Sequence, residues 1–286
     1  STCGARGWRV EICQETRRQC WSTRKQGAPT PQMYCIPDPQ KREKGGEDAL
    51  FFTHHKYCIS HPPKKTWQLN YDHGVILGVA DGVGGWAEMG VDPSKYSRGF
   101  MEGCCQLLAS TNRPVDLRTM LHAAYRDNFR NRVRGSCTVC LVQVKGSKLE
   151  TLNVGDSGYR IIRNGELLYK SDEQQYKFNF PYQLGEGGSR LSVAQRREHD
   201  VLPGDIIVVA TDGVYDNLYD DELVKVVCGP MYNVAEQLAK AASVAANDDK
   251  RDSPFTDAWN EGTMRPRRSG GKLDDIACVV TRVGSC

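Results

Sequence analysis

Four aspartates of this sequence each lie at one end of a short apolar segment. They are Asp81 after 75–80, Asp156 after 151–155, Asp212 after 206–211 and Asp274 before 276–280. Any one of them alone is typical of an ordinary turn beside a strand. Turn chemistry does not explain four such placements, and a carboxylate at the end of a buried strand is costly without a cation partner. We therefore interpret these aspartates as one cluster of carboxylates at the ends of several strands.

The residue types in this cluster favour a hard divalent cation. Glu47, Asp48 and Asp216 lie in similar motifs, and no His or Cys accompanies any of them. Ligand sets made only of oxygen suit magnesium or manganese rather than zinc. Because clustered carboxylates repel each other, divalent ions are needed to keep them ionised. Two ions about 3.5–4 Å apart would activate a bridging water and hold a phosphoryl oxygen, an arrangement that hydrolyses phosphate esters.

The sequence lacks the motifs of other phosphate chemistries and of serine hydrolases. It contains no Walker Gly-x-x-x-x-Gly-Lys-[Ser/Thr], no kinase His-Arg-Asp and no Gly-x-Ser-x-Gly. Water, rather than a side chain, is therefore the expected nucleophile. Directly after Asp81, glycines at Gly82, Gly84 and Gly85 allow the backbone to turn sharply and to approach a ligand closely.

The elements that position these acids are predicted from the hydrophobic patterns. Strands are expected at 49–52, 75–80, 137–144, 149–153, 159–163, 167–170, 206–210 and 276–280. Helical spacing predicts helices at 94–109, 116–134, 220–228 and 234–246. Blocks of antiparallel strands with separate pairs of helices favour an α+β fold, a layered sandwich with helices outside the sheets. Polar residues 172–200 are interpreted as a flap, and 247–272 as an arginine-bearing loop.

Composition indicates an ordinary globular protein with one large core. The chain has 286 residues and a net charge of +3, which is too small to favour a nucleic-acid binder. No apolar run approaches the ~18 residues that span a membrane. Residues 1–44 carry several prolines and no clear periodicity, so we expect an extended leader there and one domain at 45–286. The basic residues of the leader are consistent with the tail of an organelle transit peptide, although Glu11 and Glu15 weaken this interpretation.

The twelve cysteines are predicted to be reduced and mostly structural. A chain of this size does not need a disulfide scaffold. The one Cys-x-x-Cys pair, Cys137 and Cys140, lies in a predicted strand. Because residues three apart on a strand point to opposite faces, these two cannot share a metal ion.

Five motifs together resemble those of the metal-dependent protein phosphatase 2C family, in the family's order. They are Gly-Gly-Glu-Asp-Ala at 45–49, Val-Ala-Asp-Gly-Val-Gly-Gly-Trp at 79–86, Asn-Val-Gly-Asp-Ser-Gly at 153–158, Thr-Asp-Gly-Val-Tyr-Asp-Asn at 211–217 and Gly-Gly-Lys-Leu-Asp-Asp-Ile at 270–276. Each motif is weak alone, but five in order are specific. The resemblance implies a four-layer α-β-β-α sandwich of two antiparallel sheets flanked by helices, with metal ions at one end of the sheets. Details of the motifs are similar to the branch of mitochondrial and T-cell-activation phosphatases, and the motif at 211–217 is similar to plant members.

The resemblance also implies roles for the acids. The metal ligands would be Glu47, Asp48, Asp81, the Gly82 carbonyl, Asp156, Asp212, Asp216 and Asp274. Among them Asp81 would bridge two ions, Asp212 and Asp274 would bind the second, and these three would be central to catalysis. Asp156 and Asp216 match positions that hold a looser third ion. Asp275 stands where the family usually has Asn and is expected to bond backbone groups instead.

Two positions depart from the animal cytosolic members of the family. Val83 stands where those members have a His that is proposed as the general acid. Many bacterial members and members of the organelle branch also lack this His. Glu43 stands where they have a phosphate-gripping Arg. The candidates to replace that Arg are Arg42, Lys44, Arg265, Arg267 and Arg268.

These observations lead to one main functional hypothesis and two alternatives. The first is a protein serine/threonine phosphatase that uses two or three Mg²⁺ or Mn²⁺ ions and in-line attack of a metal-bridging water. The second is a pseudophosphatase that binds phosphoproteins without turnover, and the third, ranked last, is a metal nuclease. We expect phosphoprotein substrates, a monomer, no nucleic-acid partner, no membrane span, and a mitochondrial-matrix location with a plastid or the cytoplasm as alternatives.

Overall fold

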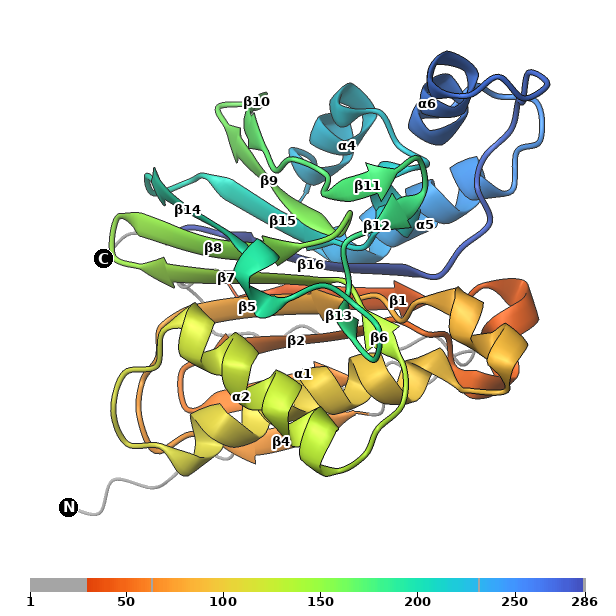
Figure 1. Cartoon of the computed structure of the whole chain (residues 1–286). Coiled ribbons are helices and arrows are strands. Elements are labelled where there is room, and N and C mark those ends of the chain that lie inside the picture. The colour runs from red at the N-terminus through yellow and green to blue at the C-terminus, as the bar shows by residue number, and fades with distance from the viewer. Residues whose placement is uncertain (1–29, 63, 231, 285–286) are drawn as a thin grey trace.

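Two antiparallel β-sheets face each other, and helices cover the outer face of each sheet (Figure 1). This computed structural model describes residues 30–62, 64–230 and 232–284. The layers are therefore helix, sheet, sheet and helix. The predicted α+β class and the predicted four-layer α-β-β-α sandwich are both confirmed.

One sheet has seven strands and the other has five. In spatial order the larger sheet contains β14 (Gln195–Asp200), β8 (Lys148–Val154), β7 (Val139–Lys145), β5 (Val75–Ala80), β2 (Ala49–His54), β3 (Tyr57–His61) and β4 (Lys65–Gln68). The smaller sheet contains β1 (Gln32–Ile36), β16 (Ile276–Arg282), β15 (Ile206–Ala210), β9 (Gly158–Arg163) and β10 (Glu166–Lys170). Two short pairs complete the strands, β6 (Ser136–Cys137) with β13 (Leu184–Gly185), and β11 (Gln175–Lys177) with β12 (Phe180–Pro181).

The helices lie in two groups that follow the two sheets. Helices α1 (Pro93–Ser110) and α2 (Leu117–Arg130) pack on the seven-stranded sheet. The five-stranded sheet is covered by helices from the second half of the chain, α3 (Asp212–Tyr215), α4 (Asp220–Val227) and α5 (Val234–Ala246), while α6 (Pro254–Gly262) lies further out. Short 3₁₀ turns occur at Pro39–Lys44, Gly84–Met89 and Leu191–Val193. Among the described residues no helix combines the length and the apolar character needed to cross a bilayer.

The start of α1 illustrates how the sequence determines an element that supports the site. Asp92 is the N-cap, and its carboxylate accepts a hydrogen bond from the Ser94 backbone at 3.2 Å. Pro93 occupies the first turn, where the missing N–H costs nothing. Tyr96, Phe100 and Cys104 then follow at intervals of four and are all buried, so the helix presents one apolar face to the sheet.

Three apolar clusters fill the spaces between the four layers. The middle cluster lies between the sheets and includes Phe52, Val79, Ile161 and Val209. Each outer cluster joins one sheet to its helices. Cys137 belongs to an outer cluster and Cys140 to the middle one, which confirms that they lie on opposite faces. The cysteines within the described residues are free thiols.

The folded unit begins earlier than the predicted boundary at residue 45. Strand β1 pairs along its whole length with β16, from Gln32 opposite Val280 to Ile36 opposite Ile276. Met33 and Tyr34 are each 1% exposed, so this strand is an integral part of the smaller sheet. The prolines that flank the strand hid its apolar character in the sequence. The rest of the predicted leader, residues 1–29, lies outside the described residues.

The predicted flap at 172–200 is more regular than expected. Strand β14 joins the edge of the larger sheet by pairing with β8. The hairpin of β11 and β12, the short strand β13 and the 3₁₀ turn at Leu191–Val193 lie in the remainder. Alternating exposed charged residues in β14 concealed this edge strand, because an edge strand with a solvent face needs little apolar character.

Candidate metal centre

Three strands from both sheets bring three of the predicted ligands together. Asp81 follows β5, Asp156 lies just after β8, and Asp212 lies just after β15. One carboxylate oxygen from each of these residues lies within 4.8 Å of the other two. Since β5 and β8 belong to the larger sheet and β15 to the smaller, the packing of the sheets creates this cluster.

Glu47 and Asp48 lie at the entrance of β2 and are almost completely buried, with exposures of 3% and 1%. The Thr211 hydroxyl donates a 2.9 Å hydrogen bond to Asp48 Oδ2, which links this residue to the end of β15. Burial raises the pKa of Asp48 well above its usual range, and the nearby Asp275, Asp274 and Asp212 raise it further. The Lys41 ammonium lies 2.8 Å from Glu47 Oε2.

Asp216 and Asp274 are joined to Asp212 by the ammonium of Lys272. Lys272 Nζ contacts Asp212 Oδ2 directly and lies 2.6 Å from Asp216 Oδ2 and 3.2 Å from Asp274 Oδ2. Burial raises the pKa of Asp216 to about 7, because Lys272 offsets only part of that effect and Asp212 adds to it. For Asp274 the net shift has the opposite direction. Burial would raise its pKa, but Lys272 and Lys41 together hold the pKa below its usual range.

Asp81 and Asp156 are also only weakly compensated. Burial raises the pKa of Asp81 well above its usual range, and its carboxylate neighbours, Asp212 first, raise it further. Burial and then Asp212 also raise the pKa of Asp156, and Lys272 opposes this only in part. These two carboxylates would be stabilised in their charged form by a cation placed between them and Asp212.

Unpaired oxygen atoms show that the residues fit a hard divalent cation. Asp48 Oδ1 and Asp156 Oδ1 are buried and have no hydrogen-bond partner among the described residues. Buried polar atoms without partners are rare and costly, and all the predicted donors are carboxylate or carbonyl oxygens. Mg²⁺ and Mn²⁺ take such oxygen ligands.

Gly82 lies against the Glu47 backbone, with a 3.2 Å hydrogen bond from Gly82 N to Glu47 O. A Cβ atom at position 82 would lie 2.8 Å from both Glu47 O and Pro93 O. Only glycine therefore allows β2, β5 and the start of α1 to meet at this point. The predicted ligands of the second motif are thereby held next to those of the first.

The prediction for Asp275 is confirmed. Its Oδ1 accepts a 2.7 Å hydrogen bond from Asp38 N, and its Oδ2 accepts a 2.8 Å hydrogen bond from Glu47 N. Asp275 thus fixes the segment before β2 rather than facing the other acids as a free ligand.

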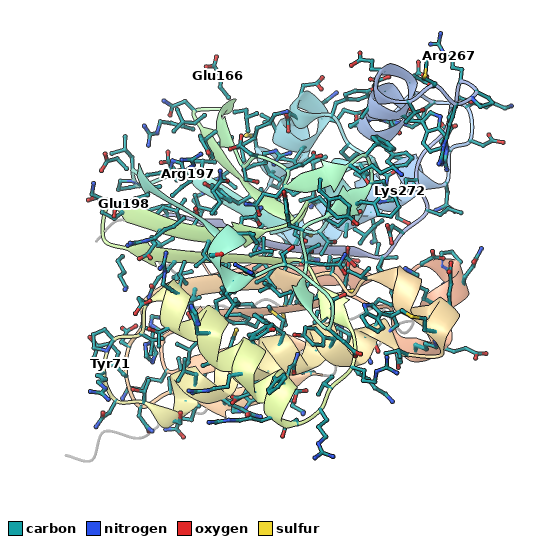
Figure 2. The ribbon with its side chains drawn as sticks, viewed as in Figure 1. Tyr71, Glu166, Arg197, Glu198, Arg267 and Lys272 are labelled. Atoms are coloured by element: carbon teal, nitrogen blue, oxygen red, sulfur yellow. The ribbon has the colours of Figure 1, made fainter. Side chains whose placement is uncertain are left out.

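The cations of the site are not those expected from the sequence. Arg265 stacks on Trp259, and Arg268 lies over Phe255 and Trp259. Figure 2 shows Arg267 projecting beyond α6, away from Lys272. The structure records no contact of Arg42 or Lys44 side chains with the acids, within the part of the chain it describes. The lysines that contact the acids are Lys41 and Lys272, and which residue grips phosphate stays a prediction.

A signal for Lys272 was present in the sequence. It stands two residues before Asp274, within the fifth motif, so its side chain had to lie near the acids. Lys41 gave no comparable signal, because only the 3₁₀ turn at Pro39–Lys44 directs it toward Glu47. Val83 contributes an apolar side chain, and its backbone N–H donates to Ser136 O at 3.0 Å.

Comparisons with known proteins agree with this geometry. A profile of the family described as Stage II sporulation protein E (SpoIIE) matches residues 71–284. The chain is 38% identical over 260 residues to "Probable protein phosphatase 2C 80" of Arabidopsis thaliana, covering 87% of this chain and 57% of the relative. It is 36% identical to "Protein phosphatase PTC7 homolog" of Danio rerio, covering 83% of this chain and 81% of the relative.

The fold is also similar to a solved structure, "X-ray structure of the photosystem II phosphatase PBCP". That similarity has a TM-score of 0.79 with 30% identity, and it covers 90% of this chain and all of the other. The chain spans about half the length of several plant relatives that it matches, for example 57% and 50% of two Arabidopsis thaliana proteins.

Proposed function

The chain belongs to the protein phosphatase 2C family, and we propose that it removes phosphate from phosphoserine and phosphothreonine in proteins with the help of Mg²⁺ or Mn²⁺. One observation carries this proposal: Asp81, Asp156 and Asp212 converge within 4.8 Å from the ends of three strands. Burial raises the pKa values of Asp81 and Asp156, and of the two lysines only Lys272 compensates part of this charge, at Asp156 and Asp212. Such an arrangement has a physical purpose only if a multivalent cation binds there.

The residues of this chain would divide the work of the centre between them. By the match of the motifs, Asp81 would bind two ions, one of them together with the Gly82 carbonyl, Glu47 and Asp48. Asp212 and Asp274 would hold the second ion, and Asp156 with Asp216 would hold a third. When bound, such ions supply an activated water for in-line attack and neutralise charge on the phosphoryl oxygens.

The substrate would approach over the surface that the β11–β12 hairpin and α6 form together. Phe178, in the turn of the hairpin, contacts Phe255 and Trp259 of α6 at ring-centroid distances of 5.4 Å and 5.8 Å. Arg268 lies over both of the α6 rings. An aromatic and cationic surface beside the carboxylates favours a phosphorylated peptide segment as substrate.

The alternative of a phosphoprotein-binding module without turnover is less favoured. A binding module has no physical reason to retain seven acids that repel each other. The remaining argument for a binding module is that Val83 stands where the animal cytosolic members of the family have a His. A serine alkoxide leaving group can be protonated by solvent, so this difference does not remove the reaction.

We further propose that the chain acts as a monomer in an organelle. The mitochondrial matrix follows from the resemblance of the motifs to one branch of the family. The relative named as a photosystem II phosphatase supports a plastid as the alternative, and the cytoplasm is the third possibility. Fractionation of cells that express the full-length protein distinguishes these locations.

The decisive experiment is hydrolysis of a phosphothreonine peptide by the purified chain during a manganese titration. We expect turnover that rises with Mn²⁺, is abolished by EDTA and falls at least ~10³-fold in Asp212→Asn. Lys240→Met is a suitable control, since Lys240 pairs only with Glu236 on the surface of α5. Folded wild-type protein that binds Mn²⁺ and yet shows no turnover would instead favour the binding module.

A further inference from the structure

The ammonium of Lys272 lies where three of the proposed ligands converge. It makes ion pairs with Asp212, Asp216 and Asp274, from the end of β15, the end of α3 and the segment before β16. The side chain is only 14% exposed. A single ammonium in contact with three carboxylates thus occupies the position of a cation at the centre, and Lys272 is labelled in Figure 2.

The chain holds Lys272 in place through its backbone. The buried Asn217 side chain accepts a 2.8 Å hydrogen bond from Lys272 N and donates a 2.9 Å hydrogen bond to Lys272 O. At the preceding residue, Gly271, a Cβ would lie 2.2 Å from Ala245 O, so the loop is pressed against the end of α5. The backbone at 272 is therefore fixed, while the four-carbon side chain remains able to change rotamer.

Lys41, the other lysine of the site, has a different set of partners. Its Nζ lies 2.8 Å from Glu47 Oε2 and 3.3 Å from Asp275 Oδ2, and more distantly 3.4 Å from Asp274 Oδ1. Asp275 already accepts two backbone hydrogen bonds and is not a proposed ligand. Lys41 therefore divides its charge between two proposed ligands, Glu47 and Asp274, and one residue that is not a proposed ligand, Asp275, whereas all three partners of Lys272 are proposed ligands.

We propose that Lys272 is a built-in competitor of the divalent ion. In the metal-free chain its ammonium neutralises Asp212, Asp216 and Asp274, and an ion that binds these residues must displace it. This inference rests on the proposed metal-dependent function. It adds that Lys272 makes the metal-free fold more stable and makes the binding of the metal ion weaker. An ammonium and a divalent ion on the same carboxylates repel each other, because both are positive and would lie within a few ångströms of each other.

A route for the displaced side chain is present. Lys272 Nζ already lies 5.3 Å from the centroid of the Phe255 ring, on the side of the aromatic surface defined by Phe178, Phe255 and Trp259. The ring face can hold the ammonium by a cation–π contact after the carboxylates are given up. Metal loading would thus move a positive charge from the acids toward the surface where the substrate is proposed to approach.

The first test compares wild type, Lys272→Met and the surface control Lys240→Met. Isothermal titration with Mn²⁺ measures the dissociation constant, and thermal melting in EDTA measures stability without metal. For Lys272→Met we expect binding that is tighter by roughly tenfold or more and a lower melting temperature in EDTA, with Lys240→Met unchanged. Unchanged or weaker Mn²⁺ binding by folded Lys272→Met would overturn the proposal.

A second test uses the wild-type chain and does not depend on the folding of a variant. Reductive methylation by formaldehyde, followed by mass spectrometry, reports how accessible each lysine is. We expect methylation of Lys272 to be slow in EDTA and several-fold faster with saturating Mn²⁺, while Lys240 reacts at one rate in both. Equal rates at Lys272 in the two conditions would refute displacement.

Phosphopeptide turnover, measured on the same samples, separates the two proposals. Wild type that binds Mn²⁺ with faster methylation of Lys272 but has no turnover contradicts the phosphatase proposal and supports displacement. If wild type is active, Mn²⁺ does not change the methylation of Lys272, and Lys272→Met binds Mn²⁺ as tightly as wild type, only the displacement is contradicted.

Discussion

Strand β15 carries an aspartate at each end, and the two carboxylates are compensated in opposite ways. At the start of the strand, Asp205 is paired with Arg163 by hydrogen bonds of 2.9 Å and 2.8 Å, and Leu202 N donates a third at 2.8 Å. At its end, Asp212 lies with Asp81 and Asp156 and shares one ammonium with two other acids. A carboxylate that is paired with its own arginine stabilises the fold. Carboxylates that outnumber the cations near them need a bound cation to compensate their charge.

The same contrast appears in the pKa values. Burial alone would raise the pKa of Asp205, but the hydrogen bonds from Arg163 and from the Leu202 backbone hold it below its usual range. The pKa values of Asp81 and Asp156 are raised instead. Among these three acids, the lowered pKa belongs to the carboxylate with its own arginine, and the raised pKa values belong to the two carboxylates that converge with Asp212.

The largest expected effect is at the undercompensated end. Asp81→Asn should reduce manganese-dependent phosphopeptide turnover at least ~10³-fold, since it removes the proposed bridging carboxylate. In EDTA the same variant should be more stable than wild type by about 1 kcal/mol, because a buried charge among like charges is removed. Steady-state kinetics and urea unfolding in EDTA check the two parts. A variant that loses both activity and stability would show that Asp81 supports the fold and contradict the contrast.

The matched change at the other end should have the opposite consequences. Asp205→Asn should lower the free energy of unfolding by about 2 kcal/mol, since Arg163 and a backbone N–H lose a buried carboxylate partner. Its turnover with saturating Mn²⁺ should stay within about twofold of wild type, because the length of β15 separates it from the acids. Urea unfolding and phosphopeptide kinetics measure both quantities. A large loss of turnover with native stability would break the comparison.

The smallest effect is the pH dependence of this stability difference. A carboxyl group whose folded pKa is lowered contributes stability above its unfolded pKa of about 3.9, and this is lost as pH falls through the folded value. The gap between wild type and Asp205→Asn should therefore be full at neutral pH and shrink below about pH 4. Urea unfolding of both proteins across this range, in EDTA, gives the comparison. A gap that grows as the pH falls would mean that Asp205 is not held in its charged form.

The sequence predicted the layers and the identities of the clustered acids because both depend on local patterns. The runs before Asp81, Asp156 and Asp212 have the apolar character of buried strands, and their order matched a known set of motifs. Even Asp275, set apart from the others in the prediction, bonds backbone groups as expected. These features require only that each segment adopt its preferred structure.

The features that were missed depend on contacts distant in sequence. Strand β1 gains its place only by pairing with β16, and edge strand β14 only by pairing with β8. Lys41 reaches Glu47 and Asp275 because a short 3₁₀ turn orients it. The expected arginines found aromatic rings instead. A pattern along the chain does not reveal which of several cations the fold will bring to a site.

The pairing of β1 with β16 has a consequence for how the protein is made. Strand β16 lies between β1 and β15, so the smaller sheet cannot be completed until the last described strand has left the ribosome. Asp274 and Asp275, directly before β16, arrive at the same late moment, and Asp275 then ties down Asp38 and Glu47. During synthesis, β1 must wait until β16 has been made. The centre can therefore assemble only after this late segment has emerged, and synthesis that stops before residue 274 leaves a chain with neither a complete smaller sheet nor a complete set of acids.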